Sequence, residues 1–109
     1  MLKQENRLRK KKDFEEVFKK GKTKTGKNLF LKARKNKLKT NRFGWVVSLK
    51  VSKKAVVRNK IKRQLRAIAK KNFSNLKQGL DIVVVVRPEI VNKNYQEIEN
   101  DLESLLKIL

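Results

Sequence analysis

The chain of 109 residues carries 31 Lys and Arg against 10 Asp and Glu, which gives a formal net charge of +21 at pH 7. It contains neither Cys nor His, which excludes a disulfide scaffold, a thiolate nucleophile and the usual general base at neutral pH. No apolar run approaches the roughly 20 residues of a membrane span, and the first residues (MLKQENRLRKKK) lack the apolar core of a signal peptide. We expect a single soluble, cytoplasmic domain over residues 1–109.

Acidic residues are absent from the middle of the chain. No Asp or Glu occurs between Val17 and Leu80, a stretch that holds 22 of the 31 basic residues. A surface of one sign repels itself, and nucleic acid offsets this repulsion because each neutralised phosphate releases counterions. A Lys-biased but merely solvated surface and an anionic membrane surface are the alternatives. We expect a nucleic-acid partner, no membrane and no small-molecule substrate.

The elements predicted along the chain follow the order α-β-β-α-β-α. Phe14, Val17 and Phe18 lie on one face of a helical period, while Gly21 and Gly26 among Thr and Lys are typical of a loop. β-branched and aromatic residues indicate the strands. The complete prediction is a helix over 13–20, a loop over 21–26, a strand over 29–34, a turn over 36–41, a strand over 43–51, a helix over 55–71, a connection over 73–79, a strand over 80–87 and a helix over 93–109.

The C-terminal part of the chain indicates how the layers pack. The apolar run over 80–87, which ends at Pro88, is typical of a strand buried on both faces. The last helix has an apolar stripe composed of Tyr95, Ile98, Leu102, Leu105, Leu106 and Leu109. Its other faces carry Glu97, Glu99, Asp101 and Glu103. One α/β domain with a mixed sheet and helices packed on it is the predicted fold.

The helix over 55–71 combines an apolar stripe with a row of cations. The residues predicted to face the core are Ile61, Leu65, Ile68 and Ala69. Cations recur every four residues along one flank, at Arg58, Lys62, Arg66 and Lys70. Like charges at this spacing destabilise an isolated helix by a few tenths of a kcal/mol per pair, and neighbouring phosphates reverse that sign. A solvated face is the alternative, and Asn59 either reads a base or phosphate or caps the helix start.

Residues 54–66 (KAVVRNKIKRQLR) resemble the RNR segment of the bacterial ribonuclease P protein subunit, whose pattern is A-V-x-R-N-(R/K)-(I/L)-K-R-x-x-R. Other landmarks occur in the same order. Asn6-Arg7-Leu8 precedes a helix that begins with Asp13-Phe14, as in that family. Residues 44–48 (GWVVS) and 81–88 (DIVVVVRP) resemble two of its strands.

The resemblance implies a fold and a division of labour. The fold is an α+β sandwich, of the type of the second domain of ribosomal protein S5, with a left-handed βαβ crossover that the usual rule does not predict. The implied function is that of the protein subunit of a ribonucleoprotein. The ribonuclease P RNA of this particle removes the 5′ leader of precursor tRNA using Mg²⁺. The protein then holds no catalytic residue and no metal of its own.

The resemblance also assigns two groups of site residues. Bases of a single-stranded leader stack on aromatic rings for about 1–3 kcal/mol each. The residues expected to bind the RNA subunit are Lys53, Lys54, Arg58, Asn59, Lys60, Lys62, Arg63, Arg66 and Lys70. Those expected in the leader cleft are Phe14, Phe18, Phe30 and Lys32. Phe14 and Phe18 as ordinary core residues remain the alternative, and Trp45 is expected in the core.

The chain departs from the family pattern at three places. Lys32 stands where an aromatic residue is common, so it either contacts phosphate or leaves the stacking to Phe30. The loop before the basic helix lacks a Gly and has Leu49 in place of a Lys. Lys60 stands where Arg is frequent, which keeps the charge and loses bidentate geometry.

Two competing functions remain at this stage. A basic ribosomal protein shares the small size and high charge. A protein nuclease needs clustered carboxylates to hold a metal, and Asp13, Glu15 and Glu16 are the candidates, although a role at the positive end of a helix dipole is favoured for them.

Overall fold

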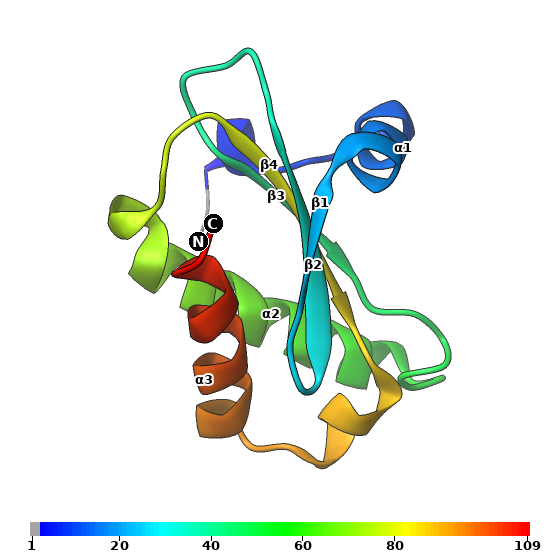
Figure 1. Ribbon diagram of the computed structural model, residues 1–109. Helices are drawn as coiled ribbons and strands as arrows, with labels where there is room; N and C mark the ends of the chain where they lie inside the picture. The colour runs from blue at the N-terminus through cyan, green and yellow to red at the C-terminus, as the bar shows by residue number, and fades with distance from the viewer. Residues whose placement is uncertain (1–2) are drawn as a thin grey trace.

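A four-stranded sheet separates one helix from two others in the computed structural model, which describes residues 3–109 (Figure 1). α1 lies on one face of the sheet, and α2 and α3 cover the other. None of the helices described has the length and apolar character that a membrane crossing requires. The elements are α1 (Lys11–Lys20), β1 (Lys22–Thr25), β2 (Leu29–Lys35), β3 (Arg42–Val46), α2 (Ala55–Asn72), β4 (Leu80–Val86) and α3 (Tyr95–Leu106), with short 3₁₀ turns at Gln4–Asn6, Phe73–Asn75 and Pro88–Asn92.

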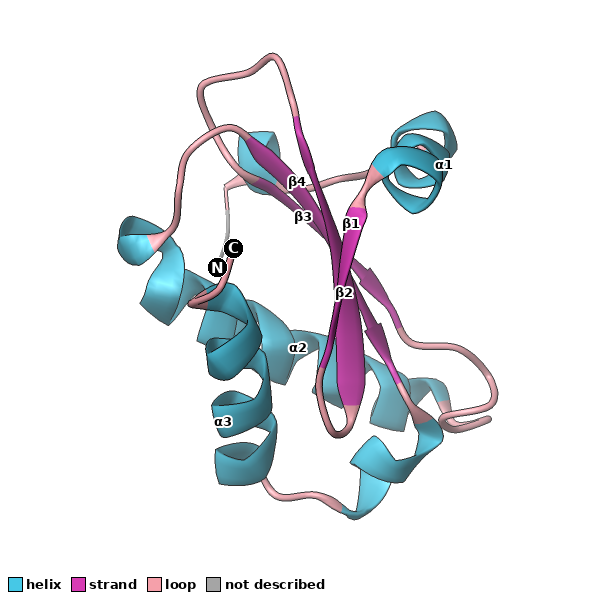
Figure 2. Ribbon diagram, viewed as in Figure 1, coloured by secondary structure: helices cyan, strands magenta, loops and turns pink. Residues whose placement is uncertain are grey.

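The sheet is mixed, as predicted, with the strand order β1-β2-β4-β3 (Figure 2). β2 runs antiparallel to both β1 and β4, whereas β3 and β4 are parallel neighbours. α2 connects these two parallel strands. The α+β sandwich is therefore confirmed.

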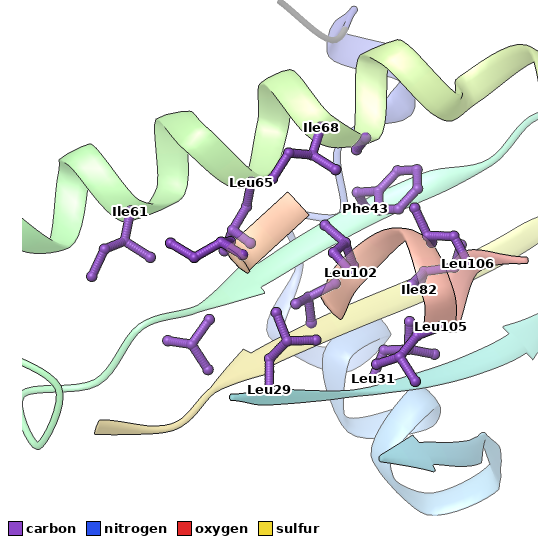
Figure 3. Close-up of a cluster of buried hydrophobic side chains, with 14 of the residues drawn as sticks. Leu29, Leu31, Phe43, Ile61, Leu65, Ile68, Ile82, Leu102, Leu105 and Leu106 are labelled. Atoms are coloured by element: carbon purple, nitrogen blue, oxygen red, sulfur yellow. The ribbon is translucent and has the colours of Figure 1, made fainter. Parts of the chain in front are cut away.

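The main core lies between the sheet and the pair α2 and α3 (Figure 3). Every second residue of β2 and β4 points into it, as the period of two requires. The apolar stripe predicted for α2 is confirmed, since Ile61, Leu65, Ile68 and Ala69 are all buried. The buried Ile and Leu side chains of this stripe each contribute about 1.5–3 kcal/mol relative to exposure. β4 is buried on both faces, because a second cluster, Leu8, Val17 and Val83, lies under α1.

The predicted element order is wrong at one place, because residues 22–25 form strand β1 rather than a loop. The sequence KTKT has no apolar face, so its alternation carries no burial signal. Pairing with β2 creates the strand: Lys22 lies opposite Ala33 and Thr25 opposite Phe30. The order is thus α-β-β-β-α-β-α.

The prediction for α3 is correct for most of the apolar stripe and wrong at Tyr95 and at two charged positions. Ile98, Leu102, Leu105 and Leu106 are buried, while Tyr95 is exposed. Asp101, expected on an outer face, is buried because its carboxylate accepts the backbone N–H groups of Lys27 at 2.9 Å and Asn28 at 2.7 Å. Glu99 is also buried and lies 3.3 Å from the Lys71 ammonium.

Several bounds of strands and helices also differ from the prediction. β3 ends at Val46, not at residue 51, although Val47 and Val51 are buried from the loop that follows. β4 ends at Val86, and the 3₁₀ turn from Pro88 follows it. α3 begins at Tyr95, where Asn94 and Glu97 form a reciprocal capping box.

Candidate nucleic-acid interface

The N-terminal end of α2 is held by its own arginine. Lys54 at the N-cap position makes no side-chain cap, and the first turn contains no acidic residue. The Arg58 guanidinium donates a hydrogen bond to the Ser52 carbonyl oxygen at 2.9 Å, which fixes the loop before the helix. This contact uses only part of the fork of donors of Arg58. Arg58 therefore positions Lys53 and Lys54 beside the helix start.

The nine residues predicted to bind the RNA subunit lie on α2 and on the loop before it. Within residues 3–109, none of their cations lies within ion-pair distance of a carboxylate. Three of them are half-buried along one flank, namely Arg58, Lys62 and Arg66. The exposed ones are Lys53, Lys54, Asn59, Lys60, Arg63 and Lys70.

The segment before α1 is fastened beside β3. The Asn6 side-chain amide donates to the Thr40 hydroxyl at 2.6 Å and to the Asn41 carbonyl at 2.9 Å. Arg7 forms a parallel bridge with Phe43, whose carbonyl oxygen accepts the Leu8 N–H at 2.8 Å. The segment thus extends the sheet for one or two residues and then leaves it toward α1.

This segment and α2 form the walls of one groove of about 330 Å³, which we call the N-terminal groove. It runs beside β3, the edge strand of the sheet on this side. Among the described residues that line it there is no carboxylate. Its cationic lining is Arg7, Arg9, Lys62 and Arg66, and its apolar lining is Leu8, Phe14, Phe43 and Trp45.

Two features of the N-terminal groove suit an RNA ligand. Arg7 lines the groove, and its buried Nε atom has no hydrogen-bond partner among the described residues. Trp45, predicted in the core, is only half-buried and stacks on Phe43 with ring centres 5.4 Å apart. Cations beside an aromatic surface are the combination that single-stranded nucleic acid uses.

The face of the sheet toward α1 contains three rows of cross-strand neighbours. The rows are Phe30-Val85-Val46, Lys32-Val83-Gly44 and Arg34-Asp81-Arg42. α1 covers the second row with Val17 and Phe14, and its acidic residues pair with the third. The first row, here called the apolar row, stays half-buried.

The four residues predicted for the leader cleft occupy different positions on this face. Phe30 belongs to the apolar row and shares its face with Lys32, as the period of two predicts. Phe18 is 38% exposed, and the Lys32 ammonium lies 3.0 Å from its carbonyl oxygen and 5.7 Å from its ring centre. Phe14 is half-buried against Gly44 and turns toward the N-terminal groove.

Ion pairs fasten α1 to the charged third row. The Arg42 guanidinium donates two hydrogen bonds to Asp81, at 2.9 and 2.7 Å, and lies 3.4 Å from the Asp13 carboxylate. Hydrogen bonding to Asp81 raises the pKa of Arg42, and its charge adds to this effect. Glu16 lies 2.9 Å from Arg34 and 3.4 Å from Lys20.

These ion pairs engage two of the carboxylates that were candidates for metal ligands. Asp13 and Glu16 face arginines rather than one another, and the described residues contain no group of three or more acidic side chains that could hold a metal ion. Mg²⁺ needs several oxygen ligands with little competition from cations. The carboxylates beside α1 do not fit such a site.

The structure brings together some of the predicted site residues and adds others. Lys62 and Arg66 from the basic helix share a groove with Phe14, which was assigned to the cleft. Arg7, Arg9 and Trp45 were not predicted to belong to the site. The only sequence signal for Arg7 was its place in the Asn6-Arg7-Leu8 landmark, and nothing in the sequence indicated that this segment reaches α2.

The family model that matches residues 2–109 is described as Ribonuclease P. A ribonuclease P protein component from Pseudanabaena is 49% identical over 107 residues, covering 97% of this chain and 92% of the relative. One from Clostridium botulinum (strain 657) is 41% identical over 104 residues, covering 94% and 93%.

Solved structures are similar over nearly the same length. The RNase P protein of Staphylococcus aureus matches with a TM-score of 0.88 at 35% identity and covers 94% of both chains. That of Thermotoga maritima matches with a TM-score of 0.87 at 34% identity, covering 94% of this chain and 96% of the other.

Proposed function

The chain belongs to the ribonuclease P protein family, and from this premise we propose that it binds the RNA subunit through α2 and the N-terminal groove, and the 5′ leader of precursor tRNA through the face beside α1. As a member of this family it is the protein component of a tRNA-processing endoribonuclease. The ribosomal and protein-nuclease alternatives have no comparable support.

One observation carries the RNA-binding part of the proposal. Lys62 and Arg66 of α2 share a single groove with Arg7 and Arg9, and no carboxylate lines it among the described residues. The cations of such a groove repel one another, and an anion that binds there relieves this repulsion. Phosphates of folded RNA supply that anion, and counterion release drives their binding.

The apolar row supports the leader part of the proposal. Phe30, Val46 and Val85 form a half-buried strip that α1 leaves open, and Phe18 lies exposed at the end of α1. Stacking on such rings tolerates any base, which suits a leader whose sequence varies from one tRNA to another. A cation near the strip, Lys32, adds attraction for the leader phosphates.

The hydrolysis itself is assigned to the RNA subunit with Mg²⁺. The chain has no His and no Cys, and the carboxylates beside α1 are engaged by arginines. RNA phosphates are the natural ligands of Mg²⁺ in such a particle. In this proposal the protein positions the leader and stabilises the complex with the RNA subunit.

Reconstitution tests the proposal. The purified protein alone should cleave nothing, and adding it to the cognate RNA subunit at low Mg²⁺ should restore leader removal. A K62A/R66A variant should bind the RNA subunit more weakly and lower the slope of log K against log salt by about 1–2, because each phosphate contact contributes about 0.9. A K27A/K93A variant removes two cations from a hollow that contains carboxylates and serves as the control.

Two outcomes contradict the proposal. The first is an unchanged salt slope for K62A/R66A, which removes these residues from the interface. The second is turnover by RNA-free protein, which places the chemistry in the polypeptide.

A further inference from the structure

A second basic hollow lies at the opposite edge of the sheet, beside β1. It has a volume of about 360 Å³, and we call it the β1-edge hollow. Its floor is apolar and includes Ala33 and Leu80. Lys22 lies opposite Ala33 and Lys35 opposite Leu80 in the strand register, so both lysines share the face that carries α2 and α3.

The charges around the β1-edge hollow are unbalanced. Its lining contains six cations and no carboxylate side chain among the described residues. Lys20 and Arg34 pair with Glu16 outside it. The other four, within residues 3–109, have no ion pair and no side-chain hydrogen bond; they are Lys22, Lys24, Lys35 and Lys77.

This lack of acidic residues separates the β1-edge hollow from other hollows of the molecule. A hollow between α3 and the turn after β1 is lined by Glu97 and Asp101, and one beside α1 by Asp13, Glu16 and Asp81. The lining of the N-terminal groove likewise contains no acidic side chain among the described residues. The two edges of the sheet therefore carry the same electrostatic character.

Protection of an edge strand explains only part of this arrangement. Lysines on an edge discourage pairing with another sheet, which accounts for Lys22 and Lys24. Lys35 stands at the end of β2, and Lys77 on the connection before β4, where no free edge needs protection. The convergence of lysines from three segments on one hollow needs another cause.

We propose that the β1-edge hollow binds the phosphodiester backbone of a second RNA segment. Lysine ammoniums recognise phosphate as point charges. No aromatic residue lines the hollow, so it offers no platform for a stacked base and reads no sequence. The inference shares with the proposed function only the premise that the partner is RNA.

The proposal gives the two edges of the sheet a joint role. Neighbouring strands lie about 4.8 Å apart, so β1 and β3 are separated by roughly 14 Å across the sheet. RNA held at both edges encloses the protein between two segments. The polypeptide then acts as a spacer that fixes the distance between them.

Salt-dependent binding to a short blunt-ended RNA duplex of mixed sequence tests this proposal. The full-length protein is compared with K22A/K77A, K62A/R66A, the combined variant and the control K27A/K93A, and the fold of each is verified by circular dichroism. We expect K22A/K77A to lower the salt slope by about 1–2, a larger reduction than in the control K27A/K93A. In the combined variant, the reductions from K22A/K77A and K62A/R66A should add.

The outcomes separate the two RNA sites. A K22A/K77A slope equal to that of K27A/K93A overturns this proposal and leaves the proposed function intact. A normal salt slope for K62A/R66A together with a reduced slope for K22A/K77A supports the β1-edge proposal and contradicts the assignment of Lys62 and Arg66 to an RNA interface. A third outcome overturns the choice of RNA: K22A/K77A loses binding to an acidic peptide, poly-glutamate, while its RNA slope stays unchanged.

Discussion

The ammonium of Lys32 on β2 lies 3.0 Å from the carbonyl oxygen of Phe18 on α1 and 5.7 Å from the centre of the same residue's ring. Carbonyl groups in the last turn of a helix lack intrahelical donors and attract cations. One lysine thus closes the end of α1 and holds its exposed aromatic ring. Lys32 therefore orients a ring that another element supplies.

Replacing Lys32 by Met should release Phe18 and weaken binding of precursor tRNA with a leader. A surface cation–π contact and an exposed hydrogen bond together contribute about 1 kcal/mol, which corresponds to roughly fivefold in affinity. The measurement is the dissociation constant of the reconstituted enzyme for leader-bearing and mature tRNA. K32R keeps the cation and should stay near the wild type. Equal losses for both tRNAs contradict a role in leader binding.

Phe18 and Phe14 should respond differently to replacement by Leu. Phe18 is 38% exposed, so F18L should lower the urea midpoint only slightly, through the lost contact with Lys32, and weaken leader binding by about 1–2 kcal/mol through lost stacking. Phe14 packs on Gly44, so F14L should lower the midpoint as well. The urea midpoint and leader affinity, measured on both variants, separate the two roles. A stability loss in F18L with unchanged leader affinity indicates packing instead.

The parts of the fold that could be predicted from the sequence are those in which the spacing of apolar residues indicates the buried face. The stripe of α2 and the apolar run of β4 each specify a buried surface without reference to other elements. No apolar periodicity indicates the pairing of β1 or the burial of Asp101. The strand depends on β2 for its pairing, and the Asp101 carboxylate is buried because backbone N–H groups more than 70 residues away satisfy it.

In the candidate site, too, local spacing could be predicted from the sequence and tertiary contacts could not. The cation row of α2 is visible as a spacing of four, whereas the N-terminal groove depends on contacts across the fold. Asn6 bonds to Thr40 and Asn41, and this tertiary anchor brings Arg7 to the wall opposite Lys62. Sequence spacing cannot reveal such an anchor. The RNA contacts of all these residues stay predictions.

The ion pairs of Glu16 should appear in its titration. The hydrogen bond and charge of Lys20, followed by the charge of Arg34, hold the pKa of the Glu16 carboxyl below its ordinary value. Because the folded pKa is the lower one, this stabilisation is complete above the unfolded pKa and is lost as pH falls through the folded pKa. An NMR titration of the side-chain carboxyl measures it.

Single substitutions identify the source of this effect. K20A should raise the pKa of Glu16 most, R34A less, and K19A least, in the order of their contributions. A Glu16 pKa at the ordinary value in the wild-type protein contradicts the contact of Glu16 with Lys20 within α1 and its contact with Arg34 of β2.

Gly44 allows α1 to approach the sheet, and a methyl group there should disturb both. A Cβ at this position lies 2.5 Å from Cε1 and Cζ of the Phe14 ring, closer than unstrained atoms approach. G44A should therefore displace the ring and reduce the free energy of unfolding by about 1–3 kcal/mol. The same substitution in an F14A background should cost less, because the ring that it meets is absent. Urea denaturation of the four proteins of this cycle measures the coupling, and an identical cost in both backgrounds contradicts the contact between Gly44 and Phe14.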